Sequence, residues 1–147
     1  MDIKVNNIEQ NIQPEALKPT QDAAGDAFRF ALMSNIGESE LQERLSNLMS
    51  EITAEGEIIA KRKNIKDMRR YRGLVKDFMN EILNRSHQFS RQNFLDKKGR
   101  HRVYGIIRLV DQNLDDLAAE LLKEESDNLS ILAKIGEIRG LLIDLLM

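Results

Sequence analysis

The chain has 147 residues, of which 22 are basic and 24 acidic, so a single domain with one apolar core is expected. The absence of cysteine excludes disulfides and thiolate metal sites. No apolar run approaches the roughly 18 residues that a transmembrane helix needs, and the N-terminal residues do not resemble a secretion signal. We therefore expect a cytoplasmic protein that does not span a membrane.

The first 24 residues differ in composition from the rest of the chain. Both prolines, Pro14 and Pro19, lie here among asparagine, glutamine and isolated apolar side chains. Such a segment buries too little apolar surface to order its backbone. We expect a flexible tail over residues 1–24 and one helical domain over residues 25–147. An alternative is that the isolated apolar residues dock on a partner as a short strand or turn.

After the tail, apolar residues recur at alternating steps of three and four, which indicates amphipathic helices. The pattern predicts a short helix over residues 22–33 and four longer helices over residues 38–62, 64–94, 100–125 and 126–147. The buried faces expected in the four long helices consist, in chain order, of Leu41, Leu45, Leu48, Ile52 and Ile59; Met68, Tyr71, Val75, Phe78 and Ile82; Val103, Ile107, Val110, Leu114, Leu117 and Leu121; and Ile131, Ile135, Ile138, Leu142 and Leu145.

Short connections between consecutive helices make neighbours antiparallel. The predicted fold class is therefore all-α, an up-down antiparallel bundle of four main helices with the short first helix packed on its side. Asn64 is the expected N-cap of the third helix, and Ser126 or Asp127 that of the fifth. Gly56 is an expected weak point in the second helix, whose buried face also includes Glu55.

Two segments resemble signatures of the YaaR-like family of small bacterial proteins. One is KNIKDMRRYRGLVKDF over residues 63–78, and the other is ILAKIGEIRGLLIDL over residues 131–145. The resemblance covers about residues 40–147, and Gly73 and the Leu-Met ending depart from the commoner pattern. It implies a small cytoplasmic helical bundle. It implies no catalytic residues, because the family's biochemical function is uncharacterised.

Charge is distributed unevenly along the chain. Residues 1–60 carry 4 basic and 11 acidic side chains, residues 61–102 carry 14 and 4, and residues 103–147 carry 4 and 9, for net charges of −7, +10 and −5. One interpretation is structural, because a basic helix between acidic neighbours gains surface ion pairs of about 0–1 kcal/mol each. The other is functional, because a basic stripe binds phosphates or an acidic protein surface.

Two groups of cations are candidates for binding a partner or a phosphate. The first follows the outer face of the third helix and the turn before it, where the stripe also contains Gly73. The second lies at the start of the fourth helix, where free N–H groups attract anions, although a solvated turn is the alternative. The candidate residues are Lys61, Arg62, Lys63, Lys66, Arg69, Arg70, Lys76, Arg91, Lys97, Lys98, Arg100 and Arg102. The two turns are expected at opposite ends of the third helix. Tyr71 is expected in the core, with base stacking as the alternative.

Gly136 and Gly140 lie four residues apart in a helix otherwise rich in leucine and isoleucine. Two glycines there cost about 2 kcal/mol in helix propensity. Close approach of another helix, either within the bundle or from a second subunit, would compensate for this cost. The two glycines are therefore a candidate helix-packing interface.

No catalytic residue, metal site or cofactor is predicted. The two histidines, His87 and His101, do not form the Glu-x-x-His pattern of di-iron bundles. There is neither a Gly-x-Ser-x-Gly elbow nor a glycine-rich phosphate loop. We expect a non-enzymatic module that binds another protein, with a homodimer as one candidate form. The alternative is a nucleic-acid-binding module that contacts phosphates through the third helix and residues 97–102.

Overall fold

The computed structural model describes residues 21–93 and 97–147, with side chains described for residues 25–84 and 99–147. The described chain forms five helices and no strand, which confirms the all-α fold class. The helices are α2 (Gln21–Asn35), α3 (Ser39–Arg62), α4 (Asp67–Asn93), α5 (Lys97–Leu121) and α6 (Asn128–Leu146). The predicted tail over residues 1–20 lies outside the described residues, and its expected boundary at residue 24 falls inside α2.

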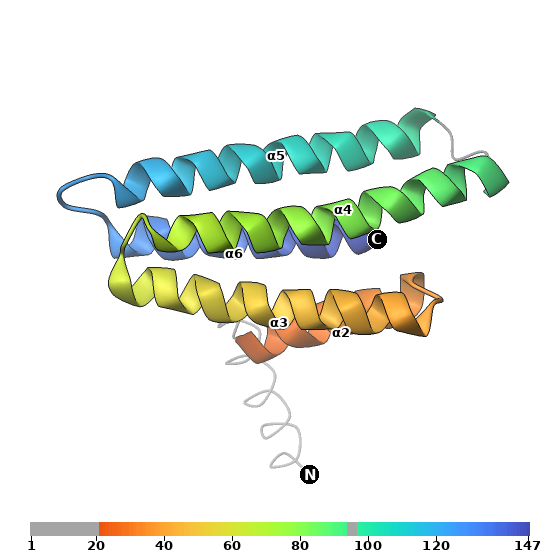
Figure 1. Cartoon of the computed structure of the whole chain (residues 1–147), viewed down its shortest axis with the longest axis horizontal. Helices are drawn as coiled ribbons and strands as arrows, with labels where there is room; N and C mark the ends of the chain where they lie inside the picture. Colours follow the sequence, from red (N-terminus) through yellow and green to blue (C-terminus); the bar gives the residue numbers. More distant parts are fainter. Residues whose placement is uncertain (1–20, 94–96) are drawn as a thin grey trace, which may run out of the picture.

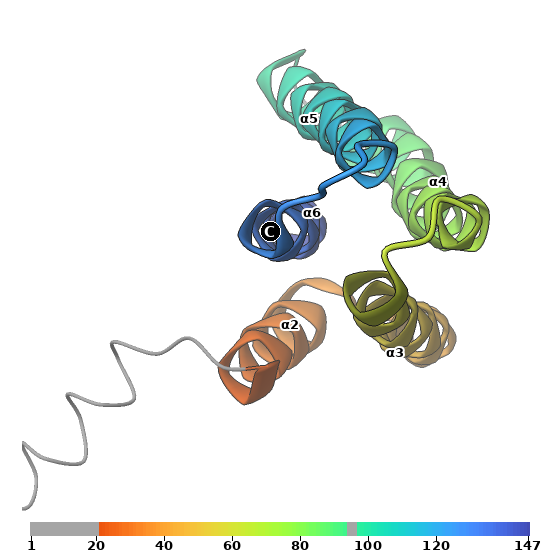
Figure 2. The same ribbon diagram turned by 90° about the vertical axis from the view of Figure 1, so that its left-hand side faces the viewer.

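The helices run alternately in opposite directions along the long axis of the molecule (Figure 1). Viewed along that axis, α5, α4, α3 and α2 follow an arc whose open side is occupied by α6 (Figure 2). The most extensive contacts join α3 to α4 and α5 to α6, and α6 also contacts α2, α3 and α4. The up-down bundle with a short helix at its side is therefore confirmed.

The three-four spacing identified most of the core. Tyr71, Val75 and Phe78 of α4 are fully buried, and the Phe78 ring lies 6.2 Å from the ring of Phe28 in α2. In α3, however, Met49 is buried and the predicted Leu48 is only partly buried. The reason is that α3 packs against α2 and α6 as well as α4, so its buried face is wider than a single seam.

Other predicted core positions are less enclosed than the spacing alone indicates. Val103, Ile107 and Ile135 are partly buried and pack against the core from its edge. The remaining predicted residues of α5 and α6 are buried, including Val110 and Leu114 with no exposed surface.

Gly56 allows α3 to approach its neighbours closely. A Cβ atom at this position would lie 3.1 Å from Cγ2 of Ile135 in α6 and 3.5 Å from Cε1 of Tyr71 in α4. The neighbouring Glu55 is 7% exposed and lies 3.3 Å from Arg70 of α4. The position that is weak in helix propensity is therefore one at which three helices meet.

The connection between α3 and α4 differs from the prediction. Lys63 ends α3 in the left-handed conformation, with φ 53°, and its N–H donates to the carbonyl of Ile59 at 2.8 Å. Asn64 does not cap α4, which begins at Asp67. Its side-chain oxygen instead accepts from the N–H of Lys66 at 2.9 Å, and its carbonyl accepts from the N–H of Asp67 at 3.1 Å. Asparagine here stabilises the turn that precedes the helix.

The other helix boundaries are close to those expected. Asp127 rather than Ser126 caps α6, and its carboxylate accepts from the N–H of Leu129 at 3.2 Å. α5 begins at Lys97, three residues earlier than predicted, and ends at Leu121, four residues earlier.

Candidate interaction surfaces

The outer face of α4 carries a stripe of basic and amide side chains, as the sequence predicts. Its exposed members are Lys66, Arg69, Gly73, Lys76, Asn80 and Asn84. Among the residues that the structure describes, no carboxylate forms an ion pair with Lys66, Arg69 or Lys76. We call these three residues the α4 stripe. Their charges are exposed to solvent and available to a partner.

Other cations of α4 pair with the neighbouring helices. Arg70 lies 3.3 Å from Glu55 of α3, and Arg72 lies 3.0 Å from Asp115 of α5. Arg70 was a candidate for partner binding, but its position fits the structural interpretation, in which the basic helix pairs with acidic neighbours. The two interpretations therefore apply to different residues of the same helix.

The turn between α3 and α4 extends the basic surface to one end of the bundle. Lys61 and Arg62 are exposed, and Lys63 is partly exposed. Arg62 lies 3.8 Å from Asp67, whereas Lys61 and Lys63 pair with no carboxylate in the described part of the chain. The turn between α5 and α6, which carries adjacent glutamates, lies at the same end of the molecule (Figure 1).

The second predicted group of cations lies at the opposite end of α4 (Figure 1). Arg100 and Arg102 are exposed, and Arg102 donates to the carbonyl of Asp144 in α6 at 2.9 Å. The side chains of Arg91, Lys97 and Lys98 lie outside the described residues. The structure thus separates the two groups by the length of α4, about 40 Å at the usual rise per residue.

Tyr71 belongs to the core and is not a stacking platform. Its side chain has no exposed surface, and its hydroxyl has no hydrogen-bond partner. Burial raises the pKa of Tyr71 strongly, against a smaller lowering by the positive charge of Arg139. The predicted alternative of base stacking by this ring is therefore wrong.

The exposed side of α6 carries a row of apolar side chains and glycines, flanked on one edge by the exposed Glu137 and Asp144. Successive members of this face lie within about 100° of one another around the helix. Ile143 is partly buried and the other members are exposed. We call this face the α6 stripe; it consists of Leu129, Leu132, Ala133, Gly136, Gly140, Ile143 and Met147.

Gly136 and Gly140 face away from the other described helices. A Cβ atom at either position would meet no atom of another described helix within 4 Å. The prediction that these glycines allow close packing inside the bundle is therefore wrong, because α6 packs through the opposite face, which includes Ile131, Ile138 and Leu142. Contact of the two glycines with a second subunit stays a prediction.

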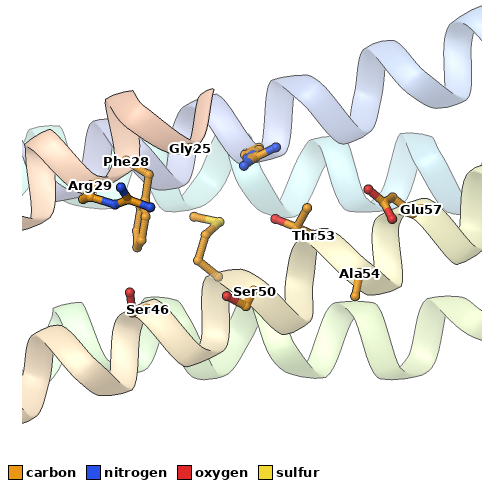
Figure 3. A pocket seen from close by; sticks show the side chains of 10 residues that line it. Gly25, Phe28, Arg29, Ser46, Ser50, Thr53, Ala54 and Glu57 are labelled. Atoms are coloured by element: carbon orange, nitrogen blue, oxygen red, sulfur yellow. The ribbon is translucent and has the colours of Figure 1, made fainter. Parts of the chain in front are cut away.

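Sequence reasoning missed a cavity of about 350 Å³ between α2, α3 and α6 (Figure 3). Its walls combine cationic, hydroxyl and apolar side chains with one carboxylate. The lining residues are Gly25, Phe28, Arg29, Ser46, Met49, Ser50, Thr53, Ala54, Glu57 and Arg139. The available signal was the recurrence of Ser46, Ser50 and Thr53 on one side of α3, but no local pattern places Arg139 beside them.

The comparisons identify the family. Residues 3–146 match the family described as a protein of unknown function, DUF327. This chain belongs to the DUF327 family. It is 34% identical over 119 residues to the uncharacterized protein YaaR of Bacillus subtilis (strain 168), a match that covers 81% of each protein. The resemblance seen in the two sequence motifs is therefore confirmed.

The fold of this DUF327 protein is similar to a solved structure. The crystal structure of the uncharacterized protein BH1478 from Bacillus halodurans superposes with a TM-score of 0.64 at 32% identity, covering 74% of this chain and 88% of that chain. Within the described residues, no group of three or more histidine, aspartate or glutamate side chains is placed to hold a metal ion. His101 is exposed, and the His87 side chain lies outside the described residues. None of the described helices combines the length and apolar character needed to cross a bilayer.

Proposed function

We propose that this protein is a non-enzymatic helical-bundle module that binds other proteins, with the α6 stripe as its docking surface. The observation that carries the proposal is the alignment of exposed apolar side chains along one helix face. Leu129 is 75% exposed and Leu132 is 53% exposed. Scattered exposed apolar residues need no explanation, but a continuous apolar face is typical of an interaction site.

The glycines at the centre of the α6 stripe favour a helix as the docking element of the partner. Gly136 and Gly140 together cost about 2 kcal/mol in helix propensity relative to alanine. Within the described part of the chain, neither lies against another helix. A helix laid across this position approaches the α6 backbone closely and gains contact area. A second copy of the chain offers such a helix, because one apolar face can pair with itself about a two-fold axis.

The test combines hydrodynamics with affinity purification. Sedimentation at micromolar concentration is expected to show a dimer, which Leu132→Glu converts to a monomer. Leu122→Glu is the matched control, because Leu122 is 69% exposed but lies outside the α6 stripe. If the wild-type chain is monomeric and retains no protein from its native cell after nuclease treatment, the proposal is rejected.

A second candidate function is the binding of nucleic-acid phosphates by the α4 stripe. It is favoured by three exposed cations that form no ion pair with a described carboxylate and span about 15 Å along the helix. Acidic groups beside the stripe count against it, because Asp77 is exposed next to Lys76 and would repel phosphates.

Salt dependence separates these cases. Three phosphate contacts on duplex DNA predict that log K falls with log salt concentration with a slope of about −3. Arg69→Glu with Lys76→Glu should abolish such binding. Arg44→Glu with Arg108→Glu makes the same charge change on exposed residues outside the candidate cations and serves as the control. Loss of binding in both double variants would show that binding follows net charge and not the α4 stripe, and no binding at low salt would exclude the nucleic-acid function.

A further inference from the structure

The cavity between α2, α3 and α6 is lined by several groups that can bind anions. Arg139 of α6 is one of its lining residues. Arg29 lines it from α2, and Ser46, Ser50 and Thr53 line it from one side of α3 (Figure 3). Its volume of about 350 Å³ is in the range of small-molecule sites. These five residues come from three helices, so only the folded bundle brings them together.

Arg139 is the unusual member of this group. It is partly buried, and its Nε atom is buried without a hydrogen-bond partner among the residues that the structure describes. Neither Arg139 nor Arg29 forms an ion pair with a described carboxylate. The missing hydrogen bond at Nε costs free energy, and the rest of this partly exposed guanidinium carries donors that an anion in the cavity would accept from.

We propose that this cavity binds the carboxylate or phosphate group of a small organic molecule, held by the guanidinium groups of Arg139 and Arg29. A guanidinium presents paired donors that match two oxygens of either group. Figure 3 shows Glu57 at the opposite end of the cavity from Arg29, so the anionic group lies at the Arg29 end. The apolar walls, which include Phe28 and Met49, contact the remainder of the molecule.

The hydroxyl groups of α3 complete the site. Ser46, Ser50 and Thr53 each supply a donor, and hydroxyl donors bind anionic oxygens without adding net charge. Arg139 belongs to α6, which contacts both α2 and α3.

The experiment is a titration of the full-length ¹⁵N-labelled chain followed by NMR. The probes are phenyl phosphate, benzoate and the neutral benzyl alcohol, each added at constant ionic strength. We expect saturable shifts of the Arg139 Nε–Hε signal and the Thr53 amide with at least one anionic probe. The two anions distinguish a phosphate site from a carboxylate site. Shifts of equal size with benzyl alcohol, or no saturable shift with either anion, would overturn the proposal.

Variants assign the effect to the cavity. Arg139→Met should weaken binding of the anionic probe about tenfold or more, and Thr53→Val, which keeps the side-chain shape, should weaken it severalfold. Arg108→Met removes an exposed arginine of α5 and should leave the affinity unchanged. Arg29→Met, on an exposed residue, provides a second test if Arg139→Met disturbs the fold. Unchanged affinity in both Arg139→Met and Arg29→Met would reject the site.

Discussion

Replacing Gly136 and Gly140 with alanine is expected to stabilise the folded monomer. Both glycines lie inside α6, and a Cβ atom at either position meets no atom of the other described helices within 4 Å. Each substitution should therefore gain the full difference in helix propensity, about 0.8–1.0 kcal/mol, for a total of about 2 kcal/mol. For a chain of this size the gain corresponds to a rise in Tm of about 4–8 °C.

The control is the same substitution at Gly56. A Cβ atom there would lie 3.1 Å from Cγ2 of Ile135, so repulsion offsets the propensity gain. Thermal and urea unfolding followed by circular dichroism would measure both variants at several protein concentrations. If the Gly136→Ala, Gly140→Ala variant is less stable than the wild type at the lowest concentration, the outer face of α6 is not free in the monomer and the reasoning fails.

The same double variant also tests the docking surface. If a partner helix lies against the two glycines, the added methyl groups should weaken association while the monomer gains stability. Sedimentation across the same concentrations measures the association, for comparison with the stability measured by unfolding. Equal gains in stability and association would show that the glycines are not at the contact.

Three further predictions concern individual side chains. Arg70→Met leaves the buried Glu55 without its partner and should lower the free energy of unfolding by about 1 kcal/mol. The cost is modest because the Arg70 side chain is 63% exposed. Glu55→Leu should be nearly neutral, and urea unfolding of the two variants measures this difference. Asp127→Ala removes the N-cap of α6 and should cost about 1 kcal/mol, with faster hydrogen exchange in the first turn; unchanged exchange there would contradict the assignment of the cap. The hydrogen bond from Lys123 lowers the pKa of Glu120 below its ordinary value of 4.5. The ionised Glu120 therefore stabilises the folded chain fully at pH values above 4.5, and this stabilisation is lost as the pH falls through the lowered pKa. Glu120→Gln should therefore make the free energy of unfolding less dependent on pH in acid. If urea unfolding gives the same pH dependence for this variant and the wild type, the effect does not come from Glu120.

Much of the fold could be predicted because the buried residues of a helix are apolar and recur at regular spacing in the sequence. Val110, Leu114 and Leu117 recur at helical spacing and all three are fully buried. Helix boundaries were less predictable, because they depend on which local hydrogen bonds form. Asparagine is a residue type that often caps helices, but the side chain of Asn64 accepts a hydrogen bond from Lys66 in the turn that precedes α4, which begins at Asp67.

The exposure and pairing of surface residues could be predicted only where they depend on a single helix. The exposure of Arg69 and Lys76 follows from their position opposite the seam of α4. The pairing of Arg70 with Glu55 depends instead on which helix lies next to α4. The direction in which the two glycines of α6 face could not be predicted for the same reason, since a propensity cost does not indicate which neighbour a residue meets.

The position of α6 in the chain order has a consequence for biosynthesis. It is made after the other four described helices, yet it contacts all of them. While the ribosome is still adding residues 128–146, the earlier helices lack the element that closes their shared interior. The nascent chain therefore keeps apolar surface uncovered until translation of this segment is complete, and chaperones have access to that surface during this interval.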